Sequence, residues 1–239
     1  MPNNHLASFS SVEEYELGKE KLSYPNVTYI VDINTTIFTK NPPMKFIDMG
    51  LSVKWAECNL GATKPEECGL FYAWGETEGY SEITDDKKFA WSDYKYSMPT
   101  TANKWAGVTK YNSDEANGVV DNLSRLLPED DAATAADSTQ RTPTQAEWLE
   151  LVNNCDSKWV TINGVQGKRL TSKINGNSIF FPSTGYLVNG SHSSEGTTSH
   201  YYTSELSSSK SAFFMTITNG SNNISNSFRC YGRSIRAVK

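Results

Sequence analysis

Residues 201–239, YYTSELSSSKSAFFMTITNGSNNISNSFRCYGRSIRAVK, contain the strongest β-structure signal in the chain. Two alternating segments, residues 211–218 and 224–231, are separated by NGSNN at residues 219–223. An Asn-Gly pair between alternating segments favours a tight hairpin, because both residue types tolerate positive φ. We therefore predict a β-hairpin here, followed by a last strand over residues 234–238.

The predicted hairpin divides its side chains between two faces, since side chains alternate along a strand. Phe213, Met215 and Ile217 form one face, which we expect to lie on the core. Phe214 and Thr216 then point outward, beside many Ser, Asn and Tyr side chains. This composition is typical of paratopes, which combine adaptable hydrogen bonding with flat aromatic contacts. A polar surface loop system without a binding role is the alternative interpretation.

Length and charge exclude several classes of protein. A chain of 239 residues suits one large domain, or a domain with a small appendage. The formal charge of −5 and the scattered Lys and Arg residues provide no basic surface, so we expect no nucleic-acid partner. No apolar run approaches the roughly 20 residues that span a bilayer, so we expect no membrane insertion. The first residues, MPNNHLASFSS, lack the pattern of a secretory signal, which indicates a trimmed chain or export within a virion.

The N-terminal residues 1–43 are predicted to form a small separate module for attachment or oligomerisation. Ser11 and Glu14 have the spacing of a capping box, which predicts a helix over about residues 12–19. Residues 27–31 and 36–39 follow as short strands. Because such a piece is too small to be stable alone, we expect it to pack on the main domain or on a second copy. An ordinary N-terminal extension is the alternative.

The main domain, residues 44–239, is predicted to combine short strands with one packed helix. Thr144 and Glu147 form a second capping box, and Trp148, Leu151 and Val152 lie on one helical face, which predicts a helix over residues 145–154. Residues 76–118 lack a sustained period and are predicted to be long surface loops. Residues 186–200 are also predicted to be a loop. Strands are predicted at residues 46–48, 53–58, 70–74, 159–162, 166–170 and 178–182.

No residue pattern indicates a metal site, a cofactor or an active site. Glu129, Asp130 and Asp131 lie before an alanine-rich stretch, where they suit a helix N-terminus; a calcium site is the alternative. His192 and His200 are interpreted as exposed loop histidines. We predict that the protein is not an enzyme, since no nucleophile and base are paired in the sequence. Cys58, Cys68, Cys155 and Cys230 include no C-x-x-C spacing, and we expect buried free thiols.

Several motifs in matching order resemble the Fibrobacter major-paralogous domain, which is abundant in gut Bacteroidetes and their phages. They are MGLSVKWA at residues 49–56, NLGAT at 59–63, YAWGET at 72–77, LPEDDAA at 127–133, RTPTQAEW at 141–148 and GRSIR at 232–236. The resemblance covers about residues 46–238. It implies an α+β domain with the C-type lectin fold, in which a similar Pro-Thr-x-Ala-Glu-Trp helix occurs in formylglycine-generating enzymes.

The resemblance also implies where a ligand binds. In phage tropism determinants with this fold, retroelements diversify the region near the C-terminus, which corresponds here to about residues 191–231. The residues assigned to ligand binding are Tyr201, Tyr202, Glu205, Lys210, Phe214, Thr216, Asn222, Asn223, Asn226 and Phe228. The implied partner is a protein or glycan on the host surface, and the implied location is the virion, in a tail, fibre or head decoration.

Alternatives remain open at this point. A structural virion decoration, or an adhesin domain on a bacterial cell surface, would have the same fold without a diversified site. The phage resemblance makes contact with other virion proteins through residues 1–43 an expectation, and a homo-trimer one candidate assembly. The Glu-Pro-Asn motif of calcium-dependent lectins and the cysteine pair of formylglycine-generating enzymes are missing, so neither activity is carried over.

Overall fold

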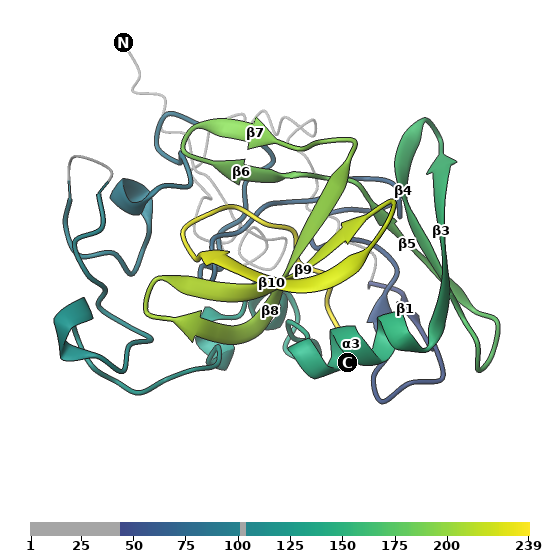
Figure 1. The fold of residues 1–239 in the computed structure, drawn as a ribbon, viewed down its shortest axis with the longest axis horizontal. Coiled ribbons are helices and arrows are strands. Elements are labelled where there is room, and N and C mark those ends of the chain that lie inside the picture. The colour runs from purple at the N-terminus through teal and green to yellow at the C-terminus, as the bar shows by residue number, and fades with distance from the viewer. Residues whose placement is uncertain (1–43, 101–103) are drawn as a thin grey trace, which may run out of the picture. The chain divides into compact units, whose positions relative to one another are not determined.

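The computed structural model describes residues 44–100 and 104–239, and the predicted N-terminal module, residues 1–43, lies outside the described residues. The described part is an α+β structure in which ten strands form four antiparallel sheets and two segments are α-helical. Figure 1 shows β8, β9 and β10 at the centre of the view, β3–β5 to the right, β6 and β7 above, and helix α3 below.

Two three-stranded sheets form the framework. The first has the order β3-β4-β5, with β3 at Cys155–Ile162, β4 at Val165–Ser172 and β5 at Ser178–Pro182. The second has the order β10-β9-β8, with β8 at Thr198–Ser208, β9 at Ser211–Thr218 and β10 at Asn222–Phe228. The predicted hairpins at residues 159–170 and 211–231 are thus confirmed, although β10 begins and ends earlier than predicted. Asn163 and Gly164, at φ 49° and 85°, form the turn between β3 and β4.

Two smaller sheets complete the strands. Strands β1 (Phe46–Ile47) and β2 (Trp55–Ala56) pair near the start of the described part. Strands β6 (Tyr186–Val188) and β7 (Ser191–Ser193) pair where a loop was predicted. That prediction was wrong because each strand has only three residues and β7 is polar, so neither shows a sustained alternation of apolar residues. Their Asn189-Gly190 turn, at φ 48° and 79°, carries the hairpin signal that the sequence analysis missed.

Helix α3 spans Gln145–Asn153, one residue shorter than predicted, and begins with the predicted capping box. The Glu147 amide donates to the Thr144 hydroxyl at 3.2 Å, and the Thr144 amide donates to the Glu147 carboxylate at 2.8 Å. Trp148 is fully buried, as predicted. The short helix α2 (Ala132–Ala136) begins after Asp131, whose carboxylate accepts the Ala133 amide at 3.0 Å. The acidic run therefore caps a helix, as the electrostatic interpretation predicted.

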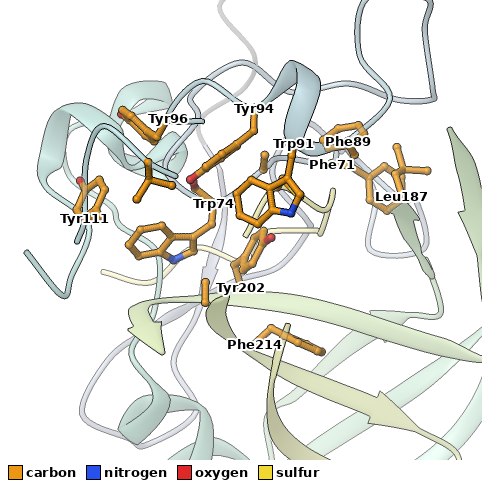
Figure 2. Packing of buried hydrophobic residues seen from close by; sticks show 14 residues of the cluster. Phe71, Trp74, Phe89, Trp91, Tyr94, Tyr96, Tyr111, Leu187, Tyr202 and Phe214 are labelled. Atoms are coloured by element: carbon orange, nitrogen blue, oxygen red, sulfur yellow. The ribbon is translucent and has the colours of Figure 1, made fainter. Parts of the chain in front are cut away.

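The predicted surface loops over residues 76–118 form part of the core, which corrects the sequence analysis. Over its described residues, 76–100 and 104–118, the segment is irregular apart from two short 3-10 helices, Trp91–Asp93 and Glu115–Asn117. However, Phe89, Tyr94 and Tyr111 are buried in it, as Figure 2 shows. Aromatic residues without a helical or strand period were interpreted as exposed, because periodicity does not detect burial that irregular backbone produces.

Strands β8 and β9 separate two hydrophobic clusters. One, here called the loop-side core, includes Trp74, Tyr202 and Phe214 (Figure 2). The other, called the helix-side core, includes Trp148, Leu151, Tyr201 and Met215. Tyr201 pairs with Met215 and Tyr202 with Phe214, so neighbouring residues on each strand enter opposite clusters. Both faces of this part of the sheet are therefore buried.

The C-terminal segment connects the elements without forming the regular strand predicted for residues 234–238. Residues 232–238 make single bridges to Trp55, Tyr72, Arg141, Leu187 and Tyr201. Arg236, which is fully buried, donates to Asn59 and to the carbonyl groups of Ala56, Glu57 and Phe180. The segment thus holds parts of the domain that are distant in sequence.

Within the described ranges, no helix has the length and apolar character that crossing a membrane requires. Cys58, Cys155 and Cys230 are buried free cysteines, as predicted, whereas the free Cys68 is only partly buried.

Candidate ligand-binding surface

Three of the residues predicted to contact a ligand are buried, which corrects that assignment. Tyr201, Tyr202 and Phe214 are 0%, 1% and 4% exposed. Alternation with one buried face predicts an outward Phe214, whereas strand β9 lies between two clusters and buries both faces at this point. These side chains support the surface from within and are not accessible to a partner.

Glu205, also predicted to contact a ligand, is engaged within the fold. Its carboxylate accepts the Gln145 amide at the start of α3 at 2.6 Å, and it contacts Arg125 at 3.2 Å. A carboxylate at a helix N-terminus stabilises the helix through its unpaired amides and its dipole. We therefore assign Glu205 to the attachment of α3 to strand β8.

The register of the hairpin separates the predicted asparagines. Asn223 pairs with Thr216, and both share the face of His200, which also pairs with Thr216. Asn222 and Asn226 belong to the opposite face, because side chains alternate along β10. The predicted site residues therefore do not form one surface.

Two predicted residues, Lys210 and Phe228, lie in an aromatic environment that the sequence analysis did not anticipate. The Lys210 ammonium lies 4.8 Å from the ring centroid of Trp105, and Trp105 contacts Trp91 at 4.7 Å. Phe228 is 40% exposed, and its ring lies 5.6 Å from those of both Trp91 and Tyr231. Trp105 and Tyr231 are half-buried, so part of each ring is accessible.

The ring contacts continue across the buried Arg233 to the β6 and β8 strands. The Arg233 guanidinium lies 5.7 Å from the rings of both Tyr231 and Tyr186. Tyr186 stacks on His200 with ring centroids 4.5 Å apart. His200 is half-buried, which corrects its interpretation as an exposed loop residue. We call this set the aromatic row: Trp105, Trp91, Phe228, Tyr231, Arg233, Tyr186 and His200.

Small polar side chains lie on the face of the β8–β10 sheet that carries His200. Phe228 belongs by alternation to the opposite face, and it contacts two rings of the row from the last position of β10. Register and alternation place the small polar residues on the same face as His200 and the buried Tyr202 and Phe214. Six of them are here called the polar face: Thr198, Thr216, Thr218, Asn223, Ser225 and Ser227. All six are exposed or half-buried. Hydroxyl and amide groups at these positions can donate and accept hydrogen bonds in many orientations.

Arg233 connects the row to the loop-side core. It is 1% exposed and lies 4.0 Å from the Phe214 ring centroid, and it donates to the Tyr202 hydroxyl at 3.0 Å. Its Nε atom has no hydrogen-bond partner among the described residues. The cation is therefore held mainly by ring faces, which attract it electrostatically.

Burial determines the protonation of the groups around Arg233. Burial, followed by the charge of Arg233, lowers the pKa of His200 to about 3. Burial also raises the pKa of Tyr202 to about 12 and raises the pKa of Tyr231. At neutral pH, His200 and both tyrosines are therefore uncharged, and Lys210 and Arg233 carry the charges of this surface.

Sequence reasoning missed Trp105, Tyr186, His200 and Tyr231 because they come from four separate segments. Trp105 lies in the irregular segment, and Tyr186 lies in the strand that was predicted to be a loop. Clustered Tyr and Ser residues were the available signal, but it does not show which rings meet.

The surface has the groups for non-covalent binding: partly exposed rings, hydroxyls, amides and a cation. In the part of the chain that the structure describes, no group of three or more His, Cys, Asp or Glu side chains is arranged to hold a metal ion. Asp130, for which a calcium site was the alternative, belongs to no such group. It contacts Tyr96, Tyr111 and Lys110.

Two cavities lie elsewhere and do not include the row. One, of about 170 Å³, is lined by residues such as Glu57, Arg169 and Phe180. The other, of about 360 Å³, contains Glu76, Lys87 and Asp93. Lys87 is paired there with Glu76 at 2.6 Å and with Asp93 at 3.5 Å, so these charges are used within the fold.

Comparisons with protein-family models, with curated proteins and with solved structures found no match to this chain.

Proposed function

We propose that this protein is a non-enzymatic ligand-binding protein of a phage, which recognises a host-surface ligand through the aromatic row and the polar face. In this proposal residues 44–239 form a C-type lectin-like domain, and residues 1–43 attach it to other virion proteins. The motif resemblance supports both the fold and the phage origin. The accessible surface, and not the buried hairpin residues, is the part that meets the ligand.

The observation that carries the proposal is the aromatic row itself. Phe228 exposes 40% of its surface in a chain whose other large aromatic residues are buried or half-buried in the described part. An exposed ring next to other rings provides contact area with little loss of side-chain entropy on binding, and neighbouring Ser, Thr and Asn side chains supply hydrogen bonds.

The supporting framework is rigid, which binding surfaces require. Strand β9 has both faces buried over Phe214 and Met215, and Arg233 is enclosed by rings beneath the row. A preorganised surface loses less entropy when it binds. The polar side chains of β10 can therefore change with little effect on the framework, because Asn223 is exposed and Ser225 and Ser227 are half-buried.

The test is the binding of the labelled full chain to a panel of intact gut Bacteroidetes cells. Phe228→Ala and Trp105→Ala should each raise the half-saturating concentration about tenfold or more, since interface aromatics contribute roughly 1 to 3 kcal/mol. Ile174→Ala is the matched control, because Ile174 is apolar, 59% exposed and on the turn between β4 and β5. Circular dichroism would verify that each variant is folded.

Equal binding by the wild type and both row variants would contradict the proposal, as would binding to none of the strains. A change in the oligomeric state of Phe228→Ala without a change in cell binding would instead support a structural virion decoration. Size-exclusion chromatography of the same samples makes that distinction.

A further inference from the structure

Two cations, Arg233 within the aromatic row and Lys210 beside it, lie over the faces of aromatic rings. Lys210 lies over Trp105, and Arg233 lies within 6 Å of Phe214, Tyr186 and Tyr231. Ring faces carry partial negative charge and attract cations. Because the protein's own cations already use this attraction, a cation from a partner would be repelled by them.

Among residues 44–100 and 104–239, no carboxylate forms an ion pair with either cation. The hairpin over residues 211–228 contains no Asp, Glu, Lys or Arg. The acids nearest the row along the chain have partners elsewhere: Asp93 accepts from the Lys88 amide and contacts Lys87, Glu205 holds the start of α3, and Glu195 lies 3.6 Å from His192. The row is therefore locally positive, although the whole chain has a formal charge of −5.

The extent of the surface favours a macromolecule over a small ligand. Small-molecule sites are concave and enclose most of their ligand, whereas neither described cavity is lined by a residue of the row. The row joins seven groups through successive contacts of 4.5 to 5.7 Å. An aromatic and arginine centre with a rim of small polar residues matches the composition of protein interfaces.

We propose that the ligand is a protein that presents an acidic surface segment, with a carboxylate placed against Lys210 beside Trp105 and apolar side chains on Phe228 and Tyr231. This inference rests on the proposed function and specifies the chemistry of its ligand. Lys210 is half-buried against Trp105 and forms no ion pair within the described residues, so it can pair with a partner's carboxylate.

Charge reversal at Lys210 tests the inference, with the strain that the wild type binds best. Lys210→Glu should weaken binding about tenfold or more at low ionic strength, and the difference should narrow at high salt as screening increases. Lys210→Arg should bind as the wild type does. Lys158→Glu is the matched control, because it changes the net charge equally at an exposed position on β3.

Treatment of the cells tests the class of ligand. Proteinase K should remove binding, whereas mild periodate oxidation, which cleaves vicinal diols of sugars, should leave it. Binding that is lost after periodate and kept after proteinase K would identify a glycan ligand and overturn this inference. Equal binding by Lys210→Glu and the wild type would also overturn it.

The outcomes separate this inference from the proposed function. If Phe228→Ala and Trp105→Ala lose binding but Lys210→Glu does not, the binding surface stands and the acidic ligand is rejected. If none of the row variants loses binding, both are rejected.

Discussion

At the scale of single residues, buried charges in this protein are stabilised by different kinds of group. Arg236 donates to one side-chain oxygen and three carbonyl groups, and it lies 4.6 Å from the Phe181 ring centroid. Asp130 instead accepts from two tyrosine hydroxyls and from Lys110. Removal of a partner from either site would leave a buried charged group uncompensated, which costs more than the intact interaction contributes.

Asp130→Asn should lower the free energy of unfolding by roughly 3 kcal/mol near neutral pH, because it leaves Lys110 without its buried partner. Burial raises the pKa of Asp130, but hydrogen bonds from Lys110, Tyr111 and Tyr96 outweigh it, so the pKa lies below the ordinary 3.8. A carboxyl with a depressed folded pKa stabilises the protein above its unfolded pKa and loses that contribution as the pH falls through the folded value. Urea denaturation should therefore show a difference between variant and wild type that narrows below about pH 4.

The exposed Asp156 provides the control for this measurement. Its side chain is 82% exposed and lies 3.9 Å from Lys173, so Asp156→Asn should change stability by less than about 0.5 kcal/mol. A difference in unfolding free energy between Asp130→Asn and the wild type that stayed constant down to low pH would contradict the assigned role of the carboxylate.

His200→Phe should make the protein less sensitive to mild acid. Burial and the charge of Arg233 lower the pKa of His200 from 6.5 to about 3, so below pH 6.5 the unfolded state binds a proton that the folded state excludes. The free energy of unfolding therefore decreases as the pH is lowered from the unfolded pKa toward the folded pKa. From about pH 7 to pH 5 the wild type should lose about 2 kcal/mol more than the variant, as measured by urea denaturation. Phenylalanine can keep the stack on Tyr186, and it removes an Nδ1 atom that is buried without a partner among the described residues.

Identical pH profiles for His200→Phe and the wild type would show that His200 gains a proton in the folded state, contrary to its burial.

Phe214 and Phe228 should separate stability from binding. Phe214 is 4% exposed and contacts Arg233 and His200, so Phe214→Ala should cost roughly 3 to 4 kcal/mol of unfolding free energy. Phe228 is 40% exposed, so Phe228→Ala should cost less than about 1 kcal/mol while weakening cell binding. Thermal denaturation alongside the binding assay measures both. Equal destabilisation by the two variants would count against the burial of Phe214.

At the scale of elements, helix α3 depends on contacts at its first turn. Thr144→Ala removes the hydroxyl that accepts the Glu147 amide, and N-cap substitutions of this kind cost about 1 kcal/mol. Thr144→Ser keeps the hydroxyl and should retain nearly all of that stability. Urea denaturation of the two variants checks the difference, and a loss equal in both would show that the methyl group, and not the cap, is responsible.

The elements with local signals could be predicted from sequence. Helix α3 has its capping box and apolar face within ten residues, and the β3–β4 and β9–β10 hairpins have Asn-Gly pairs at or beside their turns. The aromatic segment around Tyr94 and Tyr111 could not, because its partners, such as Trp74 and Tyr202, are distant in sequence and the backbone is irregular. Alternation in β9 was also insufficient, since it shows which residues share a face but not that both faces are covered.

The candidate surface was only partly predictable for the same reason. The sequence indicated the C-terminal hairpin, one member of the aromatic row, Phe228, and Lys210, which lies beside the row. Which rings stack on Arg233 depends on how β6, β8 and the turn after β10 come together, and those contacts join residues up to 47 positions apart, as Tyr186 and Arg233 are.

At the scale of the whole molecule, strands β8 and β9 belong to both hydrophobic clusters. Tyr201 and Met215 enter the helix-side core, and Tyr202 and Phe214 enter the loop-side core from the same two strands. If one cluster unfolds, one face of β8 and β9 becomes exposed, and the other cluster loses the ordered strands on which it packs. The two clusters should unfold together, although each has its own set of side chains.

Leu151→Ala tests this coupling, because Leu151 lies on α3 and is fully buried in the helix-side core. The substitution should cost about 3 kcal/mol, and amide exchange should speed up by a similar free energy throughout both clusters. The Tyr111 amide, which donates to Asp121 at 2.7 Å beside the loop-side core, is the informative probe. Leu149→Ala on the same helix is the control, since Leu149 is 43% exposed. Faster exchange confined to α3 and its neighbours, with Tyr111 unchanged, would mean that the clusters open separately and that the sheet between them does not transmit stability to the binding surface.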